Sequence, residues 1–330
     1  MKPRAVCTVM DRNYLTRGLA LYASLRKHGP AYDLHVLCMD QETWDILSHL
    51  APAGLKRVAL QSVMDDRLRR ASENRTWKEF SITCKSFFMF WLLRHHPELE
   101  MLSFADSDMF FYSDPDAVFA ELGAGSVGIT EHRFPARLEP QTSRDYGVYN
   151  GGWVTVRRDA QGMACIEDWS NRCLEWCYDR LEDGKYGDQK YLVDWPMHFE
   201  GVVVLRNKGA NLAPWNVENY VVTAAHGQLM ADDDPVVFYH FSGLRQIVRW
   251  PCRSGLYQSG LMRPAEGAVR KWIYRPYLRM LRYWEGIVGP AVEPDCGFRT
   301  VIGNRLDVPR NLWAGRFLWK LPATFHGEPL

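Results

Sequence analysis

The sequence predicts an α/β protein, because strand-like and helix-like segments alternate from the N-terminus to about residue 250. The strand-like segments are short apolar runs, some of them rich in β-branched residues, whereas the helix-like segments repeat apolar residues three and four positions apart. With 330 residues and 47% hydrophobic content, the chain is long enough to bury a large core. These observations together favour a central sheet flanked by helices.

The first sixty residues are expected to form three strands separated by two helices. Ala5–Met10 is a β-branched apolar run, and Tyr14–His28 carries apolar residues at helical spacing until Gly29 and Pro30 end the helix. The pattern then predicts a strand at Leu34–Met39, a helix at Glu42–Leu50 and a strand at Lys56–Leu60.

The alternation continues through the middle of the chain. A long helix with several aromatic residues is expected at Thr76–Arg94, followed by the apolar strand Met101–Ala105. Asp114 and Pro115 begin another helix, since Asp is a favoured cap and Pro a favoured first residue. The remaining expected elements are strands at Ser126–Thr130, Val148–Val156 and Val236–Phe241 and a helix at Met163–Tyr178.

One glycine-rich stretch is rejected as a nucleotide motif. Gly123–Gly128 has the spacing of the dinucleotide fingerprint, but that motif needs a strand before it and a helix after it. Here a helix precedes the glycines and a strand follows them. The glycines are therefore expected to end the helix and turn the chain.

The composition excludes several classes of protein. A net charge of +1 argues against general nucleic-acid binding, which favours a strongly basic surface. We find neither a long apolar stretch at the N-terminus nor the 18 apolar residues of a membrane span. The eight cysteines lack zinc-site spacing and are expected to be buried thiols in a reducing cytoplasm.

Two carboxylates follow the strand that ends at Ala105. Side chains alternate along an extended chain, so Asp106 and Asp108 are expected on the same side, where they would repel each other without a cation between them. Hard oxygen ligands suit Mg²⁺ or Mn²⁺. The same spacing recurs at residues 114 and 116 and at 232 and 234, but only the first pair ends an apolar strand, where open α/β sheets bind ligands.

The stretches "SFADSDMFFYSDP", "YNGGWVTV", "GDQKYLVDWP", "KGANLAPWN" and "FYHFSG" follow one another in the order found in one enzyme family. Over residues 1 to about 250 the chain resembles glycosyltransferase family 8 and related bacterial nucleotide-diphospho-sugar transferases. The resemblance implies the A-type glycosyltransferase fold, a Rossmann-like mixed sheet flanked by helices with a helical C-terminal extension. It also implies that Asp106, Asp108 and His240 bind Mn²⁺ (or Mg²⁺) and that the donor is a UDP-sugar.

The same resemblance suggests a nucleotide site. Asp11 and Tyr14, after the first strand, would hydrogen-bond and stack on uracil, although Asp11 could instead be a helix cap. Lys85 would contact the nucleotide, with a solvated lysine as the alternative. Gly243 keeps the family pattern after the metal-binding His, but Gln246 stands where the family has a diphosphate-binding Lys. Arg245 or Arg249 could replace that lysine.

A second group of residues is expected to face the donor sugar. Asn150, Gly151 and Gly152 resemble the family stretch on that side, and the two glycines permit close backbone approach or mark a bulge. Asp188 and Gln189 open a helix, and in the family the corresponding pair lies beneath the sugar and supports catalysis. Asp188 could also be a simple helix cap.

The chain is expected to divide into a catalytic domain at 1–250 and a helical extension at 251–330. Basic residues of the extension, Arg270, Lys271, Arg275, Arg279 and Arg282, mostly recur at helical spacing with apolar residues on another face, and Pro276 is expected to begin the helix. Such a helix could lie on the inner face of the membrane, which would suit a lipid-linked acceptor. The alternative is a helix pair packed on the sheet.

The sequence therefore favours a metal-dependent glycosyltransferase that moves a sugar from a UDP-sugar to a glycan or lipid-linked acceptor. Retention of the anomeric configuration follows only from the resemblance. An inverting enzyme would need a carboxylate base, for which Asp145 or Asp188 could serve. A non-catalytic nucleotide- or glycan-binding protein and a sugar-nucleotide pyrophosphorylase are the alternative functions.

Overall fold

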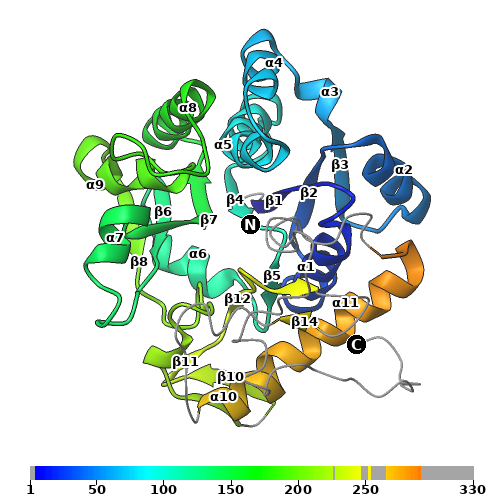
Figure 1. Ribbon diagram of the computed structural model, residues 1–330, viewed down its shortest axis with the longest axis vertical. Coiled ribbons are helices and arrows are strands. Elements are labelled where there is room, and N and C mark those ends of the chain that lie inside the picture. The colour runs from blue at the N-terminus through cyan, green and yellow to red at the C-terminus, as the bar shows by residue number, and fades with distance from the viewer. Residues whose placement is uncertain (1–3, 226, 247–251, 254–264, 291–330) are drawn as a thin grey trace, which may run out of the picture.

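The computed structural model describes residues 4–225, 227–246, 252–253 and 265–290 (Figure 1). Its centre is a seven-stranded sheet with the strand order β3-β2-β1-β4-β7-β6-β8. The strands are β1 (Arg4–Met10), β2 (Asp33–Cys38), β3 (Leu55–Ala59), β4 (Met101–Ala105), β6 (Val127–Glu131), β7 (Tyr149–Arg157) and β8 (Val202–Leu205).

The direction of the strands decides which residues meet at one edge of the sheet. β1 runs parallel to β2 and β4, and β2 runs parallel to β3, whereas β7 runs antiparallel to β4 and β6. The carboxyl ends of β1 and β4 therefore lie at the same edge as the first residues of β7. Asp11, Asp106 and Asn150 thus leave the sheet on one side, where open α/β sheets bind ligands.

Helices cover both faces of the sheet (Figure 1). One core lies between the sheet and α5, α8 and the short helices beside them, and the other lies between the sheet and α1, α2 and α6. The helices are α1 (Leu15–His28), α2 (Gln41–Leu50), α3 (Leu60–Val63), α4 (Asp66–Glu73), α5 (Trp77–His95), α6 (Asp116–Leu122), α7 (Gln141–Tyr146), α8 (Ala160–Glu175) and α9 (Trp195–His198). Two 3-10 helices, η1 (Gln189–Asp194) and η2 (Val217–Asn219), complete this part.

Short strands outside the main sheet bring distant segments together. β5 (Met109–Phe111) pairs antiparallel with β12 (Phe238–His240), with His240 opposite Met109. This pairing carries His240 to the turn that contains Asp108. The other short strands are β9 (Val222–Ala225), β10 (Gln228–Ala231) and β11 (Asp234–Pro235), which form one small sheet, and the pair β13 (Arg245–Gln246) and β14 (Cys252–Arg253).

Within the C-terminal segment, residues 265–288 are helical and pack on the rest of the molecule (Figure 1). α10 (Ala265–Ala268) leads through a π-helical turn, η3 (Val269–Tyr274), into α11 (Arg275–Val288). Ile273, Tyr277 and Leu281 are buried, and the Tyr277 ring stacks on Phe241 at 3.7 Å. α11 thus begins one residue before Pro276, close to the expected start, while η3 and α10 extend the helical path upstream of it. The buried inner face agrees with the packed alternative.

None of the five basic residues that the sequence analysis named in this segment is buried, and Arg275 and Arg279 are exposed. Among the residues that the structure describes, no helix is both long and apolar enough to cross a membrane. The division at residue 250 and the contact with a membrane surface stay predictions.

A buried tryptophan connects the main sheet to the β5–β12 pair. Trp153 of β7 has no exposed surface and stacks on Phe238 at 4.8 Å between ring centroids. Its ring also meets Phe111 and Phe119 edge to face. Because Phe111 and Phe238 belong to β5 and β12, this aromatic cluster supports the strand that follows Asp108 and the strand that ends at His240.

Every strand and helix that the sequence pattern predicts is present, with small shifts at the ends. The glycine stretch at 123–128 does connect α6 to β6, as expected from its order. The pattern missed α4, α7, β5 and β8, among others. α7 buries none of its residues and β5 has only three residues, so neither carries a readable apolar repeat.

Replacing Trp153 by alanine is expected to lower the free energy of unfolding by about 3–5 kcal/mol, because the cavity would open beneath both short strands. Urea denaturation followed by far-UV circular dichroism measures the change. The matched control is Trp272→Ala, which removes the same side chain from a position that is 41% exposed. A loss at Trp153 no larger than the loss at Trp272 would contradict the role of the cluster.

Candidate metal and nucleotide site

Asp106 and Asp108 lie in a tight turn between β4 and β5. The backbone N–H of Met109 donates to the Asp106 carbonyl at 3.0 Å, and the N–H of Asp106 donates to the carbonyl of Gly152 at 2.9 Å. The sequence-based reason for their convergence was therefore wrong, because the two carboxylates project from a turn and not from an extended strand. The prediction that they lie together holds, since the turn directs both toward the same partner.

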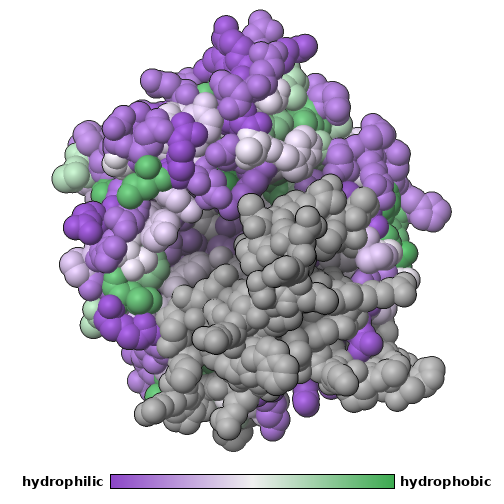
Figure 2. Space-filling model, viewed as in Figure 1, coloured by the Kyte–Doolittle hydropathy of each residue, from purple (hydrophilic) through white to green (hydrophobic). Residues whose placement is uncertain are grey.

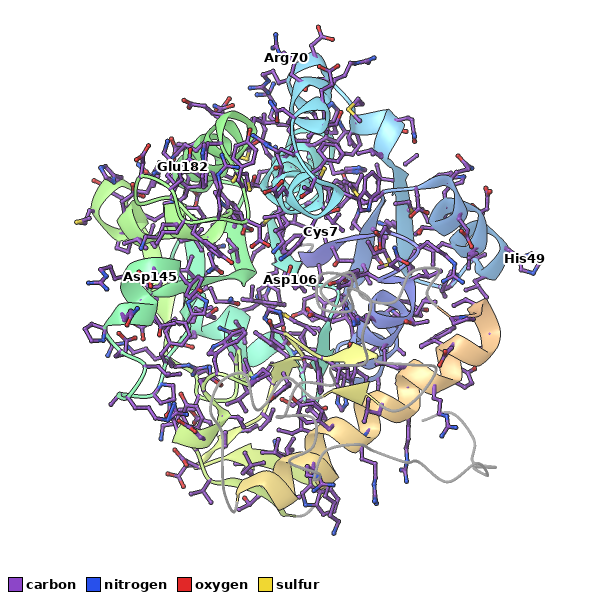
Figure 3. The ribbon with its side chains drawn as sticks, in the orientation of Figure 1. Cys7, His49, Arg70, Asp106, Asp145 and Glu182 are labelled. Atoms are coloured by element: carbon purple, nitrogen blue, oxygen red, sulfur yellow. The ribbon has the colours of Figure 1, made fainter. Side chains whose placement is uncertain are left out.

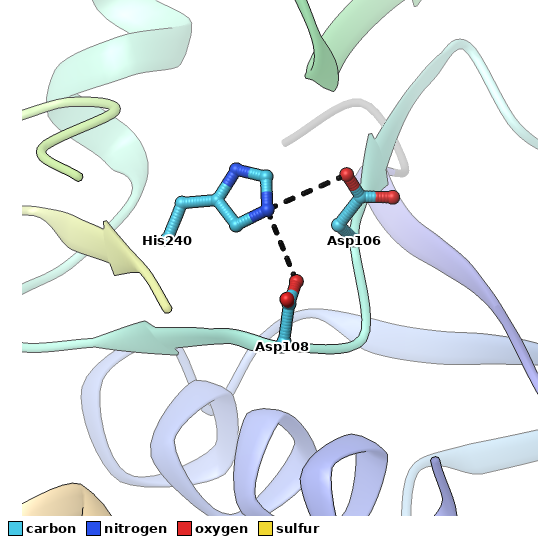
Figure 4. Close-up of side chains that lie close together, drawn as sticks. All are labelled: Asp106, Asp108 and His240. Carbon is cyan, nitrogen blue, oxygen red and sulfur yellow. Dashed lines mark ion pairs between the residues drawn. The ribbon is translucent and has the colours of Figure 1, made fainter. Parts of the chain in front are cut away.

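That partner is His240, at the end of β12 (Figure 4). Its Nε2 atom lies 3.1 Å from Asp108 Oδ1 and 3.6 Å from Asp106 Oδ2. The backbone fixes this approach, since the N–H of Phe241 donates to the Asp108 carbonyl at 2.9 Å. The three side chains offer ligand atoms that all lie within 4.8 Å of one another.

Lys85 enters the cluster from the opposite side, on α5. Its Nζ atom lies 2.7 Å from Asp106 Oδ1 and 3.5 Å from Asp188 Oδ2. Only 14% of the Lys85 side chain is exposed, so the alternative of a solvated lysine is wrong. The ammonium group joins two carboxylates that are far apart in the sequence.

The cluster shifts the pKa values of its members in opposite directions. Burial alone would lower the pKa of His240, but the carboxylates of Asp108 and Asp106 outweigh it and raise that pKa. Burial would raise the pKa of Asp108, but His240, Arg17 and Lys85 bring it below its ordinary value. For Asp188, burial is the stronger effect, and it raises the pKa despite the nearby Lys85.

The glycines of β7 let the sheet approach these carboxylates closely. A Cβ atom on Gly152 would lie 2.9 Å from Asp106 Oδ2, and one on Gly151 would lie 3.1 Å from Asp188 Oδ2. The pairing of β7 with β6 also shifts register here, between Ile129 and Thr130. Both earlier interpretations thus apply, because the glycines lie in a bulge and permit close approach.

Asn150 is buried and is held by a residue that the sequence analysis missed. Its Nδ2 atom lies 3.2 Å from His132 Nε2, and its Oδ1 accepts from the N–H of Gly152. Burial lowers the pKa of His132 to about 4, and its Nδ1 lies 3.2 Å from the carbonyl of Val148. The Trp215 ring packs edge to face on both His132 and His240. No local motif marks His132, because its partner lies across the β6–β7 pairing.

Asp11 follows β1 at the same edge of the sheet. Its Oδ1 accepts from the backbone N–H of Tyr14 at 2.9 Å, and its Oδ2 accepts from the indole Nε1 of Trp77 at 2.7 Å. Asp11 is not the cap of α1, because Tyr14 occupies that position. Tyr14 is 37% exposed and Trp77 is 48% exposed. Trp77 is a second residue that the sequence analysis missed, since its approach to Asp11 depends on how α5 packs against β1.

Asp188 and Gln189 open the expected helix, which begins as the 3-10 helix η1 and continues as α9. Asp188 makes no capping hydrogen bond, so it is not a simple helix cap. Its backbone carbonyl accepts from the Trp169 indole at 2.8 Å, and Gln189 Nε2 donates to the Tyr146 carbonyl at 3.0 Å. Tertiary contacts therefore orient both residues.

The arrangement fits a divalent cation. Adjacent ligands about 2.1 Å from an octahedral ion lie about 3 Å apart, close to the separations of His240 from the two carboxylates. Two carboxylate oxygens and an imidazole nitrogen are a donor set suited to Mn²⁺ or Mg²⁺. Among the described residues, His240 Nδ1 has no hydrogen-bond partner, which leaves Nε2 as the nitrogen directed at the carboxylates.

The chain is similar in sequence to known proteins. The chain is 33% identical over 279 residues to the uncharacterized protein YfnD of Bacillus subtilis (strain 168), which covers 84% of this chain and 88% of YfnD. It belongs to the YfnD family. A second member, YfnF of the same organism, is 32% identical over 249 residues, or 73% of this chain and 82% of YfnF. No family model matches the chain.

Solved structures assign the fold of this YfnD family member. A crystal structure of the galactosyltransferase LgtC with donor and acceptor sugar analogs superposes with a TM-score of 0.55, over 90% of this chain and 99% of that one. An active-site mutant of LgtC gives a TM-score of 0.50, over 72% and 87% of the two chains. The identities are 14% and 15%, so the likeness shows the A-type glycosyltransferase fold and no more.

The remaining residues named in the sequence analysis have the following positions in this member of the YfnD family. Gly243 lies in a turn with φ of +73°, a backbone conformation that favours glycine. Arg245 belongs to β13, while Arg249 lies outside the described residues. Asp145 lies on α7, well apart from Asp106, which is near the centre of the molecule (Figure 3). In the same orientation, hydrophilic side chains line a hollow near that centre (Figure 2).

Replacing Lys85 by methionine is expected to lower the free energy of unfolding by about 2–4 kcal/mol at pH 7.5, because two partly buried carboxylates lose their cation. The pKa of Asp188, already raised by burial, would rise further. An acid with a raised pKa in the folded state is stabilised as its proton binds, so the deficit should shrink as the pH falls toward 5.5. Urea denaturation at both pH values measures this.

The control is Lys78→Met on the same helix, since Lys78 is 69% exposed and pairs with Asp179. The free energy of unfolding of Lys78→Met should fall by less than about 1 kcal/mol. A Lys85 deficit that is as small as the Lys78 one, or that grows toward pH 5.5, would contradict the electrostatic account.

Proposed function

We propose that the protein is a metal-dependent glycosyltransferase that uses a nucleotide-sugar donor. The observation that carries the proposal is the convergence of Asp106, Asp108 and His240 at the carboxyl edge of an A-type glycosyltransferase sheet. The neighbour LgtC, which is described as a galactosyltransferase bound to donor and acceptor sugar analogs, supports it. Membership of glycosyltransferase family 8 belongs to the same proposal.

The donor binds, in this proposal, with its diphosphate beside the three ligands. A divalent ion held there would act as a Lewis acid that stabilises the charge on the leaving diphosphate. Asp106 and Asp108 would hold the ion and remain anionic, which the lowered pKa of Asp108 favours. His240 must be neutral to act as a ligand, so acid weakens this site.

The base and the sugar occupy opposite ends of the site. Asp11, fixed by Trp77, offers carboxylate oxygens to the N–H edge of a uracil, and the exposed ring of Tyr14 offers a stacking surface. UDP is therefore the proposed nucleotide. The sugar lies toward Asn150, Asp188 and Gln189, beside the glycines of β7.

Asp188 and Gln189 are the proposed residues at the reacting carbon. Asp188 is paired with Lys85 and has no capping role, so its carboxylate is available to stabilise positive charge that develops on the sugar. Retention is the proposed outcome on the family resemblance alone; of the two candidate bases for inversion, Asp145 lies away from the cluster (Figure 3), whereas Asp188 lies in it. A glycan or lipid-linked acceptor and a cytoplasmic location, with peripheral membrane contact through the basic C-terminal segment, stay part of the proposal.

Binding of UDP should require the metal and the turn. Calorimetric titration of UDP into the protein is expected to show binding with Mn²⁺ and at least about tenfold weaker binding without it, because the ion neutralises the diphosphate. In Asp108→Ala, Mn²⁺ should no longer strengthen the binding of UDP. Asp114→Ala, from a pair with the same spacing that lies at the start of α6, is the matched control and should bind as the wild type does.

The same titration with CDP, GDP and dTDP tests the choice of base. If none of the nucleotides binds in either condition, the donor site proposed here does not exist. Binding without turnover of any sugar nucleotide would favour a non-catalytic nucleotide-binding protein.

Asp188→Asn and Gln189→Ala should separate chemistry from binding. Each substitution is expected to lower the turnover rate, measured as UDP formed from the UDP-sugar, by about a hundredfold or more. The affinity for UDP itself should change less than about threefold. A coupled UDP assay and calorimetry supply the two readings, and NMR of the product anomer tests retention. Loss of UDP affinity equal to the loss of rate would place these residues at the nucleotide instead.

A further inference from the structure

The proposed donor site has fewer positive charges than its ligand needs. Asp106, Asp108 and Lys85 carry one net negative charge among them, and a divalent cation together with the diphosphate ester of a sugar nucleotide adds no net charge. Transfer of the sugar leaves a nucleoside diphosphate, whose terminal phosphate gains further negative charge. A second cation at the diphosphate would therefore stabilise both the bound donor and the leaving group.

Arg17, on the first turns of α1, lies where such a cation is needed. Its Nη2 atom donates to the carbonyl of Leu244 at 2.9 Å, directly after the turn at Gly243. Its guanidinium carbon lies 4.6 Å from the centre of the Tyr14 ring. Arg17 thus connects the proposed base-stacking residue to the loop that follows His240.

Backbone contacts bring this loop to the metal-binding turn. The N–H of Leu244 donates to the Phe241 carbonyl at 3.0 Å, and the N–H of Phe241 donates to the Asp108 carbonyl at 2.9 Å. The guanidinium therefore contacts both Tyr14, at the proposed base end, and the loop that the backbone joins to the metal-binding turn.

We infer that Arg17 binds the diphosphate of the donor and of the leaving nucleotide, in place of the lysine that Gln246 replaces. This inference rests on the proposed function and names a residue that no sequence motif marks. A guanidinium suits the role because its planar set of N–H donors can keep the Leu244 contact and still direct other donors at phosphate oxygens.

A purely structural role would make a different prediction. If Arg17 only supported the Tyr14 ring, its loss would weaken the binding of uridine, UMP and UDP equally. If it binds the diphosphate, the loss grows with the number of phosphates, because each adds charge near the guanidinium. The dependence on phosphate number therefore separates the two roles.

Arg17→Gln removes the charge and keeps an N–H donor for the Leu244 carbonyl, whereas Arg17→Lys keeps the charge. The control is Arg26→Gln at the far end of α1, where the guanidinium also donates to a backbone carbonyl, that of Pro30. UDP and UMP affinities are measured by calorimetry in Mn²⁺, and uridine affinity by ligand-observed NMR.

For Arg17→Gln we expect about tenfold or weaker UDP binding, less change for UMP and less than about threefold change for uridine. Arg17→Lys should keep most of the UDP affinity, and Arg26→Gln should match the wild type. The inference is overturned if Arg17→Gln binds UDP as the wild type does, or if it weakens uridine as much as UDP. If the wild type itself binds no nucleoside diphosphate, the proposed function fails, and the inference fails with it.

Discussion

Repulsion between two carboxylates in a partly buried turn is the constraint on which the site depends. Asp106 and Asp108 share this turn, and positive or proton-binding partners flank them on both sides. Lys85 approaches from α5 and His240 from β12, so the charge balance requires both elements to be in place. The fold on each side of the sheet is thus coupled to the electrostatics of one turn.

Close approach is the second requirement, and β7 meets it. The bulge between β6 and β7 and the glycines at 151 and 152 let backbone lie against Asp106 and Asp188, where a Cβ atom would lie 2.9 and 3.1 Å from the carboxylate oxygens. Beneath them, Trp153 fills the space between the sheet and the β5–β12 pair. A tightly packed aromatic core therefore supports a surface that must stay open enough for a ligand.

Hydrogen bonds join the end of the C-terminal helix to a loop at the same edge of the sheet. Arg12, next to Asp11 and 8% exposed, donates to the carbonyls of Val288 and Pro290 at the end of α11 and pairs with Glu42. The loop that carries Asp11 is therefore held between β1, Trp77 and α11. Through these contacts, segments from both ends of the described chain position the proposed nucleotide site.

The sequence by itself determined the order of the main strands and helices and the place of Asp106 and Asp108 after a buried strand, because burial periodicity and turn residues are local properties of the chain. The likeness of separate motifs to one family also named His240, Asp188 and Gln189. Only the tertiary structure decided that Lys85 is buried between two carboxylates. It alone brought Trp77 to Asp11, His132 to Asn150 and Arg17 to the loop after Gly243. These contacts join residues that are distant in sequence, and strand register and helix packing set such contacts, for which no single stretch of residues carries a signal.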